Sequence, residues 1–116
     1  MTDSNIVKFQ RPIRWDNLRS DEAKRVVQDL AQDTGKVLIG FHATERQDER
    51  GSITSLHVLD ILRTGDVLNA PKKNDRGDWE VEVEKRIRGG RDAVAVTIII
   101  AEGKSLFVKT VMWRDL

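Results

Sequence analysis

Residues 79–101 read WEVEVEKRIRGGRDAVAVTIIIA, and their periodicity changes at a pair of glycines. Apolar and charged residues alternate across Trp79–Ile87, which is typical of a strand with one buried face. Gly89 and Gly90 suit a hairpin turn. Residues 93–101 are apolar on both faces, as in a central strand with material on each side. The stretch therefore predicts an antiparallel hairpin whose second strand is central.

The flanking sequence extends this hairpin. Residues 102–104 predict a further turn, and residues 106–113 predict a last strand. If that strand alternates without interruption, its two faces carry Leu106, Val108, Thr110 and Met112 on one side and Phe107, Lys109, Val111 and Trp113 on the other. A brief strand at Val67 and Leu68 precedes the hairpin. We expect an antiparallel β-meander of three to four strands.

The first half of the chain predicts two helices. Ser20 is a favourable N-cap, and apolar residues at helical spacing follow it until Gly35 supplies a stop. Thr54 opens a second amphipathic helix, which Gly65 closes. Residues 37–41, between the helices, predict a short strand. This order indicates an α+β fold in which two helices of the N-terminal half pack on the meander.

The length of 116 residues suits one domain with a single core. Residues 1–19 show no sustained period, so we interpret them as an irregular arm that Trp15 holds down. Residues 20–116 are then one α+β domain.

The composition limits the classes of function and the kinds of site that we expect. Lys and Arg number 20 against 19 for Asp and Glu, so no overall field attracts nucleic acid or a membrane. The longest apolar run, residues 93–101, is too short to span a bilayer, and the N-terminus does not resemble a signal peptide. With no cysteine and only two histidines, we expect no metal site, no cofactor and a cytoplasmic location.

The segment His42 to Gly51 has an unusual charge pattern. Read as a helix, it places His42, Arg46 and Arg50 on one line, with Glu45 and Glu49 on the next. These neighbours four residues apart do not form opposite-charge pairs, as a helix selected only for stability would have. The segment is either a functional site or a solvated charged helix face.

A second charged cluster surrounds the glycine turn. Lys85, Arg86, Arg88 and Arg91 suit phosphate binding, although an edge strand protected by positive charge has the same composition. Lys85 shares the apolar face of its strand, where it could reach a polar site or cover apolar surface with its stem.

Several other residues favour a structural role over a role in RNA binding or catalysis. A row of carboxylates at Glu80, Glu82 and Glu84 would repel a phosphate chain. Trp79 and Trp113 lie in predicted strands and are interpreted as core residues rather than base-stacking residues. His57 lies on an apolar helical face and is interpreted as a structural histidine.

From His42 to Trp113 the chain has the pattern His-Ala-x-x-Arg-x-x-Glu-Arg-Gly, then Ile-Thr opening a helix, Leu-x-x-Gly closing it, and a last strand ending Val-x-Thr-Val-x-Trp. This span resembles the domain of unknown function 4258 family, small prokaryotic proteins grouped by fold with RelE-like and BrnT-like toxins. Ser52 is an insertion relative to the family's Arg-Gly-Ile. The matching residues are His42, Arg46, Glu49, Arg50, Gly51, Ile53, Thr54, Gly65 and Thr110.

The resemblance implies a toxin of the RelE-like type: a metal-independent endoribonuclease or an RNA-binding protein. In such an enzyme the ribose 2′-hydroxyl attacks the adjacent phosphate, which requires a general base, phosphorane stabilisation and a general acid. His42 or Glu49 would be the base, Arg46 and Arg50 the stabilising cations, and Lys85 or His42 the acid. Thr110 would orient a phosphate oxygen, and we expect His42, Arg50 and Thr110 to converge. RNA, the ribosome or a cognate antitoxin would be the partner.

The alternative is a non-catalytic α+β interaction module. Here Arg46, Glu49 and Arg50 form an ion-pair network that fixes helix to sheet, and the protein acts through protein contacts. The near-neutral charge and the glutamate row favour this alternative.

Overall fold

The computed structural model of the chain describes residues 12–40, 53–87 and 90–114. Its elements, in chain order, are α2 (Ser20–Ala31), the 3-10 turn η1 (Thr34–Lys36), β1 (Val37–Ile39), α4 (Ser55–Thr64), β2 (Asp66–Val67), β3 (Lys72–Lys73), β4 (Trp79–Ile87), β5 (Arg91–Ile100) and β6 (Ser105–Trp113). Within these described residues, no helix is long and apolar enough to cross a membrane.

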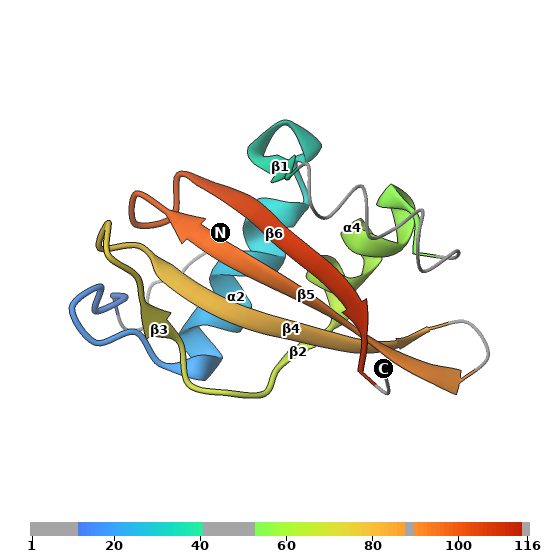
Figure 1. The fold of residues 1–116 in the computed structure, drawn as a ribbon. Helices are drawn as coiled ribbons and strands as arrows, with labels where there is room; N and C mark the ends of the chain where they lie inside the picture. The colour runs from blue at the N-terminus through green and yellow to red at the C-terminus, as the bar shows by residue number, and fades with distance from the viewer. Residues whose placement is uncertain (1–11, 41–52, 88–89, 115–116) are drawn as a thin grey trace, which may run out of the picture.

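The predicted α+β fold is confirmed: both helices cover one face of a mostly antiparallel sheet (Figure 1). The strand order is β1-β6-β5-β4-β2, and β3 also pairs with β4, so the meander β4-β5-β6 is the centre of a six-stranded sheet. The sheet is wider than expected because three short strands pair with the two outer strands of the meander. One of them, β1, runs parallel to β6.

Both limits of α2 differ from the prediction. The helix ends at Ala31 with Gln32 as its C-cap, before the predicted stop Gly35, which lies in η1. The N-cap is Arg19 rather than Ser20, and its backbone N–H donates to the Glu22 carboxylate at 3.1 Å. Ser20 lies inside the helix, and its hydroxyl donates to the carbonyl oxygen of Asn69. The cap is therefore supplied from the first turn, by the glutamate of a capping-box arrangement.

The predicted limits of α4 are confirmed. Thr54 is the N-cap, and its hydroxyl accepts from the His57 backbone N–H at 3.3 Å. The His57 ring Nδ1 accepts in turn from the Thr54 backbone N–H at 3.1 Å. His57 therefore has a structural role, because it completes the reciprocal cap of α4. Gly65 ends the helix, with its N–H donating to the Ile61 carbonyl.

The core lies between the helices and the sheet. Val81 and Val83 of β4, Ala95 of β5 and Trp113 of β6 are all at most 2% exposed. They pack with the buried face of the two helices, whose core side chains are Ala23, Val26, Val27, Leu30, Ala31, Val58, Ile61 and Leu62. This face of the sheet is called the helix face below, and the opposite one the open face.

A β-bulge in β6 changes the predicted face of several residues. Val96 pairs with Thr110 but Thr97 pairs with Val108, so Lys109 is an extra residue in β6. The expected uninterrupted alternation of this strand is therefore wrong. On the helix face lie Leu106, Val108, Val111 and Trp113, all at most 2% exposed.

The bulge also moves Thr110. The sequence placed it on one face with Leu106 and Val108, whereas the pairing places it beside Val96 on the open face. Met112 lies on the open face for the same reason, opposite Val94.

The arm residues 12–19 contact one end of the sheet. The ring N–H of Trp79 donates to the Trp15 carbonyl at 2.9 Å, and a Cβ on Gly103 would come within 3.3 Å of the Trp15 ring. Trp15 therefore does hold this part of the chain against the sheet.

Candidate binding site on the open face

The whole charged segment, His42 to Gly51, lies outside the described residues. His42, Arg46, Glu49 and Arg50 all fall within residues 41–52, so the expected convergence of His42 and Arg50 with Thr110 stays a prediction. The last described residue before them is Gly40, whose N–H donates to the Val108 carbonyl at 2.8 Å.

Thr110 and Lys85 are the expected catalytic residues that the structure describes, and Lys85 belongs to the hairpin described below. The Thr110 hydroxyl is buried and has no hydrogen-bond partner among the described residues. A buried hydroxyl without a partner costs free energy, so this oxygen is available to a group from outside the described part of the chain.

The cationic hairpin has partners within the chain. The Lys85 ammonium donates to Asp60 of α4 at 2.7 Å, and Arg86 donates to Asp92 at 3.1 Å. The guanidinium of Arg91 lies 4.2 Å from the centroid of the Trp113 ring, a cation–π contact. Arg88 lies outside the described residues.

These contacts affect what the hairpin can bind. The hydrogen bond and charge of Asp92 raise the pKa of Arg86, as expected for a guanidinium beside a carboxylate. Lys85 lies in regular register opposite Ala93, and its pair with Asp60 explains a cation on the helix face. A phosphate would have to compete with an existing acidic or aromatic partner at each described cation of this cluster.

The open face has an apolar centre, the outward-facing side of β5. Two ion pairs span it, since β5 lies between β4 and β6. Lys109 reaches Glu80 at 3.4 Å, and Arg114 pairs with Glu84. The carboxylate row is thus largely paired, with Glu82 accepting from the Asn69 amide.

Part of the open-face side of β5 is buried. Val94 is 4% exposed and Val96 is 7% exposed, although no described helix covers this face. The apolar pattern on both faces of β5 predicted material on each side. In the described part of the chain, the ion-paired side chains of β4 and of the end of β6 lie on this face.

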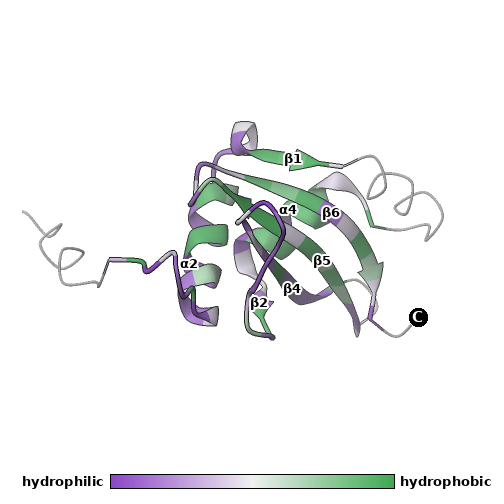
Figure 2. Ribbon diagram, turned by 60° about the vertical axis from the view of Figure 1, so that its left-hand side comes forward, coloured by the Kyte–Doolittle hydropathy of each residue, from purple (hydrophilic) through white to green (hydrophobic). Residues whose placement is uncertain are grey.

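The open-face side of β5 becomes more exposed toward Ile100, where a pocket of about 390 Å³ opens. Its apolar floor is Ile98, Ile100 and Phe107, all partly exposed. Figure 2 shows the hydrophobic colouring that runs along β5 and β6. Leu38 of β1, which pairs with Phe107 on the same face, is 65% exposed and continues the apolar surface beyond the pocket.

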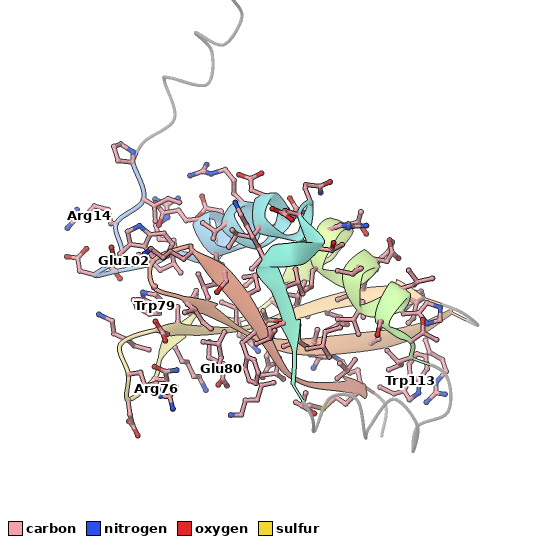
Figure 3. All side chains as sticks on the ribbon, turned by 90° about the horizontal axis from the view of Figure 1, so that it is seen from above. Arg14, Arg76, Trp79, Glu80, Glu102 and Trp113 are labelled. Atoms are coloured by element: carbon pink, nitrogen blue, oxygen red, sulfur yellow. The ribbon has the colours of Figure 1, made fainter. Side chains whose placement is uncertain are left out.

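The wall of the pocket is the turn between β3 and β4. The Asn74 side-chain oxygen accepts from the backbone N–H of Arg76 at 3.0 Å and of Asp78 at 2.9 Å. The Asp78 carboxylate accepts from the Ala101 N–H at 3.0 Å, which ties the turn to the end of β5. Figure 3 shows Arg76 and Glu80 on the side of the sheet away from the helices.

This pocket was not predicted from the sequence. The available signal was the outward-facing pair Ile98 and Ile100, because their strand has too many apolar residues for one buried face. The turn residues that complete the pocket are distant in sequence from Phe107, so no local pattern connects them.

A larger hollow of about 480 Å³ borders the arm and the start of α2. Its charged groups pair locally: Arg14 with Asp16, and Arg19 with Asp21. The hydrogen bond from Arg19 lowers the pKa of Asp21, which keeps this carboxylate ionised and paired. We therefore regard the open-face pocket as the better candidate site.

Across residues 12–40, 53–87 and 90–114, no three His, Cys, Asp or Glu side chains lie close enough together to hold a metal ion.

Comparisons with protein families, with curated proteins and with solved structures found no match to this chain.

Proposed function

We propose that this chain is a non-catalytic α+β interaction module, and that its open-face pocket binds a partner protein. One observation carries the proposal: Ile98, Ile100 and Phe107 form an apolar floor that the described chain leaves accessible. An apolar pocket bordered by polar groups is typical of a recognition site. Its volume of about 390 Å³ suits one or two side chains of a partner.

The partners of the hairpin cations support the same proposal. Lys85, Arg86 and Arg91 all contact groups of their own chain, so they support the fold more directly than they support binding to RNA. The overall charge of +1 points in the same direction.

The test is to place a charge in the pocket floor. Peptides selected by display on the wild-type protein are titrated against Ile100→Lys, with Leu56→Lys as the matched control on α4, where the leucine is 77% exposed. We expect Ile100→Lys to weaken binding about tenfold or more, because the ammonium cannot be desolvated on an apolar surface. Leu56→Lys should leave the affinity unchanged. Equal affinity for all three proteins, or failure to select any peptide, would contradict the proposal.

We propose a RelE-like endoribonuclease or RNA-binding protein as the second candidate. Two observations favour it: the buried Thr110 hydroxyl has no partner among the described residues, and Gly40, two residues before His42, bonds to β6 at Val108. Thr110 is one of the residues on which the resemblance to the domain of unknown function 4258 family rests, and it lies in β6, the strand that pairs with β1 just before the charged segment.

Arg50→Ala distinguishes the two candidates. In a nuclease this change should lower RNA cleavage about a hundredfold or more, because a cation that stabilises the phosphorane is lost, with little change in melting temperature. Arg25→Gln on α2 is the control for altered charge. In an interaction module with a buried ion-pair network, the wild type does not cleave RNA, and Arg50→Ala lowers stability by about 3–5 kcal/mol. Cleavage assays and thermal melts on the same samples give both measurements.

A further inference from the structure

We propose that the occupant of the open-face pocket is an acidic peptide segment of a partner protein, with an apolar side chain next to a carboxylate. This inference rests on the proposed function and names the chemistry of the partner. The apolar side chain would cover the floor of Ile98, Ile100 and Phe107, and the carboxylate would pair with Arg76 on the wall.

A ligand carboxylate is favoured because the other charged side chains that line the pocket already have partners. The Asp78 carboxylate accepts from Ala101, and Lys109 pairs with Glu80. The guanidinium of Arg76 is exposed, and it forms no ion pair or side-chain hydrogen bond with the described residues. A carboxylate matches the planar donor pattern of a guanidinium and can accept two of its N–H groups.

Arg76 lies in a turn whose backbone is held by hydrogen bonds. Its backbone is held by the Asn74 side chain, and the turn is closed by the bond from Asn74 N–H to the Asp78 carbonyl at 2.8 Å. A wall fixed in this way loses little conformational entropy on binding. Asp75 is exposed in the same turn but does not line the pocket, so it does not occupy the position that the ligand carboxylate would take.

A peptide suits this pocket better than a small molecule would. The site is a shallow hollow along the sheet surface, and the exposed Leu38 continues its apolar surface past Phe107. A chain lying along the face can contact the floor, Leu38 and Arg76 together, whereas a small ligand needs enclosure on most sides.

The experiment uses an array of short peptides with a shared Leu-Phe centre and three kinds of flank: Asp and Glu, Ser and Gln, or Lys and Arg. We expect the acidic set to bind the wild-type protein about tenfold more tightly than the neutral set, and the basic set to bind most weakly. Arg76→Gln should remove the preference of wild type for acidic over neutral peptides. Arg25→Gln, the same charge change on α2, should retain it. Arg76→Glu should reverse the preference in favour of the basic set.

The outcomes separate this inference from the proposed function. If acidic and neutral peptides bind equally well, and Ile100→Lys abolishes both, the acidic partner is wrong and the pocket still binds peptides. If acidic peptides bind best but Arg76→Gln and Arg76→Glu bind as wild type does, the assignment of Arg76 is overturned. If no set binds in a way that Ile100→Lys abolishes, both the inference and the proposed function fail.

Discussion

Gly65→Ala is expected to destabilise the protein by about 3 kcal/mol, at the upper end of what overpacking costs. A Cβ at this position would come within 2.5 Å of the Ile61 carbonyl oxygen and 2.7 Å of the Glu84 carbonyl oxygen. Neither oxygen can move alone, because one belongs to the last turn of α4 and the other to β4. The added methyl group would therefore push the helix away from the sheet.

The cost of this substitution is steric rather than conformational. Gly65 has φ −82° and ψ −177°, an extended conformation that alanine adopts without strain. Gly35→Ala is the matched control, since its Cβ would meet only the Asp33 side chain, at 3.2 Å. Urea unfolding of the two variants measures the difference. Equal midpoints would show that α4 does not pack against β4 as closely as described.

The two helices could be predicted because each has a local signal. In α4 the cap Thr54 and the stop Gly65 both lie at the ends of an apolar periodic stretch, and the structure confirms both. The start of α2 was one residue off, because Glu22 caps the helix from inside and this makes a favourable Ser20 unnecessary. Both kinds of cap satisfy the free N–H groups of a helix start, and the sequence alone does not rank them.

The arrangement around β6 could not be predicted from its sequence. Val108 and Val111 flank the polar pair Lys109 and Thr110, so uninterrupted alternation and a bulge at Lys109 fit the pattern equally well. The choice depends on which residues face α2 and α4, and this is a tertiary constraint. Thr110, one of the expected catalytic residues, changes face with that choice.

The candidate binding surface shows a similar limit. Clustered cations at Lys85, Arg86 and Arg91 indicated phosphate binding, but their partners Asp60, Asp92 and Trp113 come from other elements. Composition counts charges and does not show which charges are already paired. The pocket with Arg76 was missed for the complementary reason, because an arginine in a polar loop looks unremarkable until the loop is placed beside an apolar strand.

Trp113→Ala is expected to cost about 3–5 kcal/mol, a large part of the roughly 5–15 kcal/mol that a domain of this kind has. The Trp113 side chain is only 2% exposed and lies on the helix face opposite Ala93. Its loss would leave a large cavity at the end of the core and remove the aromatic ring that Arg91 contacts at 4.2 Å. Trp113→Phe should cost clearly less, because it keeps an aromatic ring in the same space.

Met112→Ala is the control that makes this a test of the bulge. Met112 lies next to Trp113 in β6 but on the open face, so we expect its truncation to cost less than half as much. Without the bulge at Lys109 the order would reverse, because Met112 would share the helix face with Leu106 and Val108, and Trp113 would point away from the helices. Thermal and urea unfolding of the two alanine variants therefore decide the register of β6. A larger loss for Met112→Ala would overturn the described pairing, and with it the position of Thr110 on the open face.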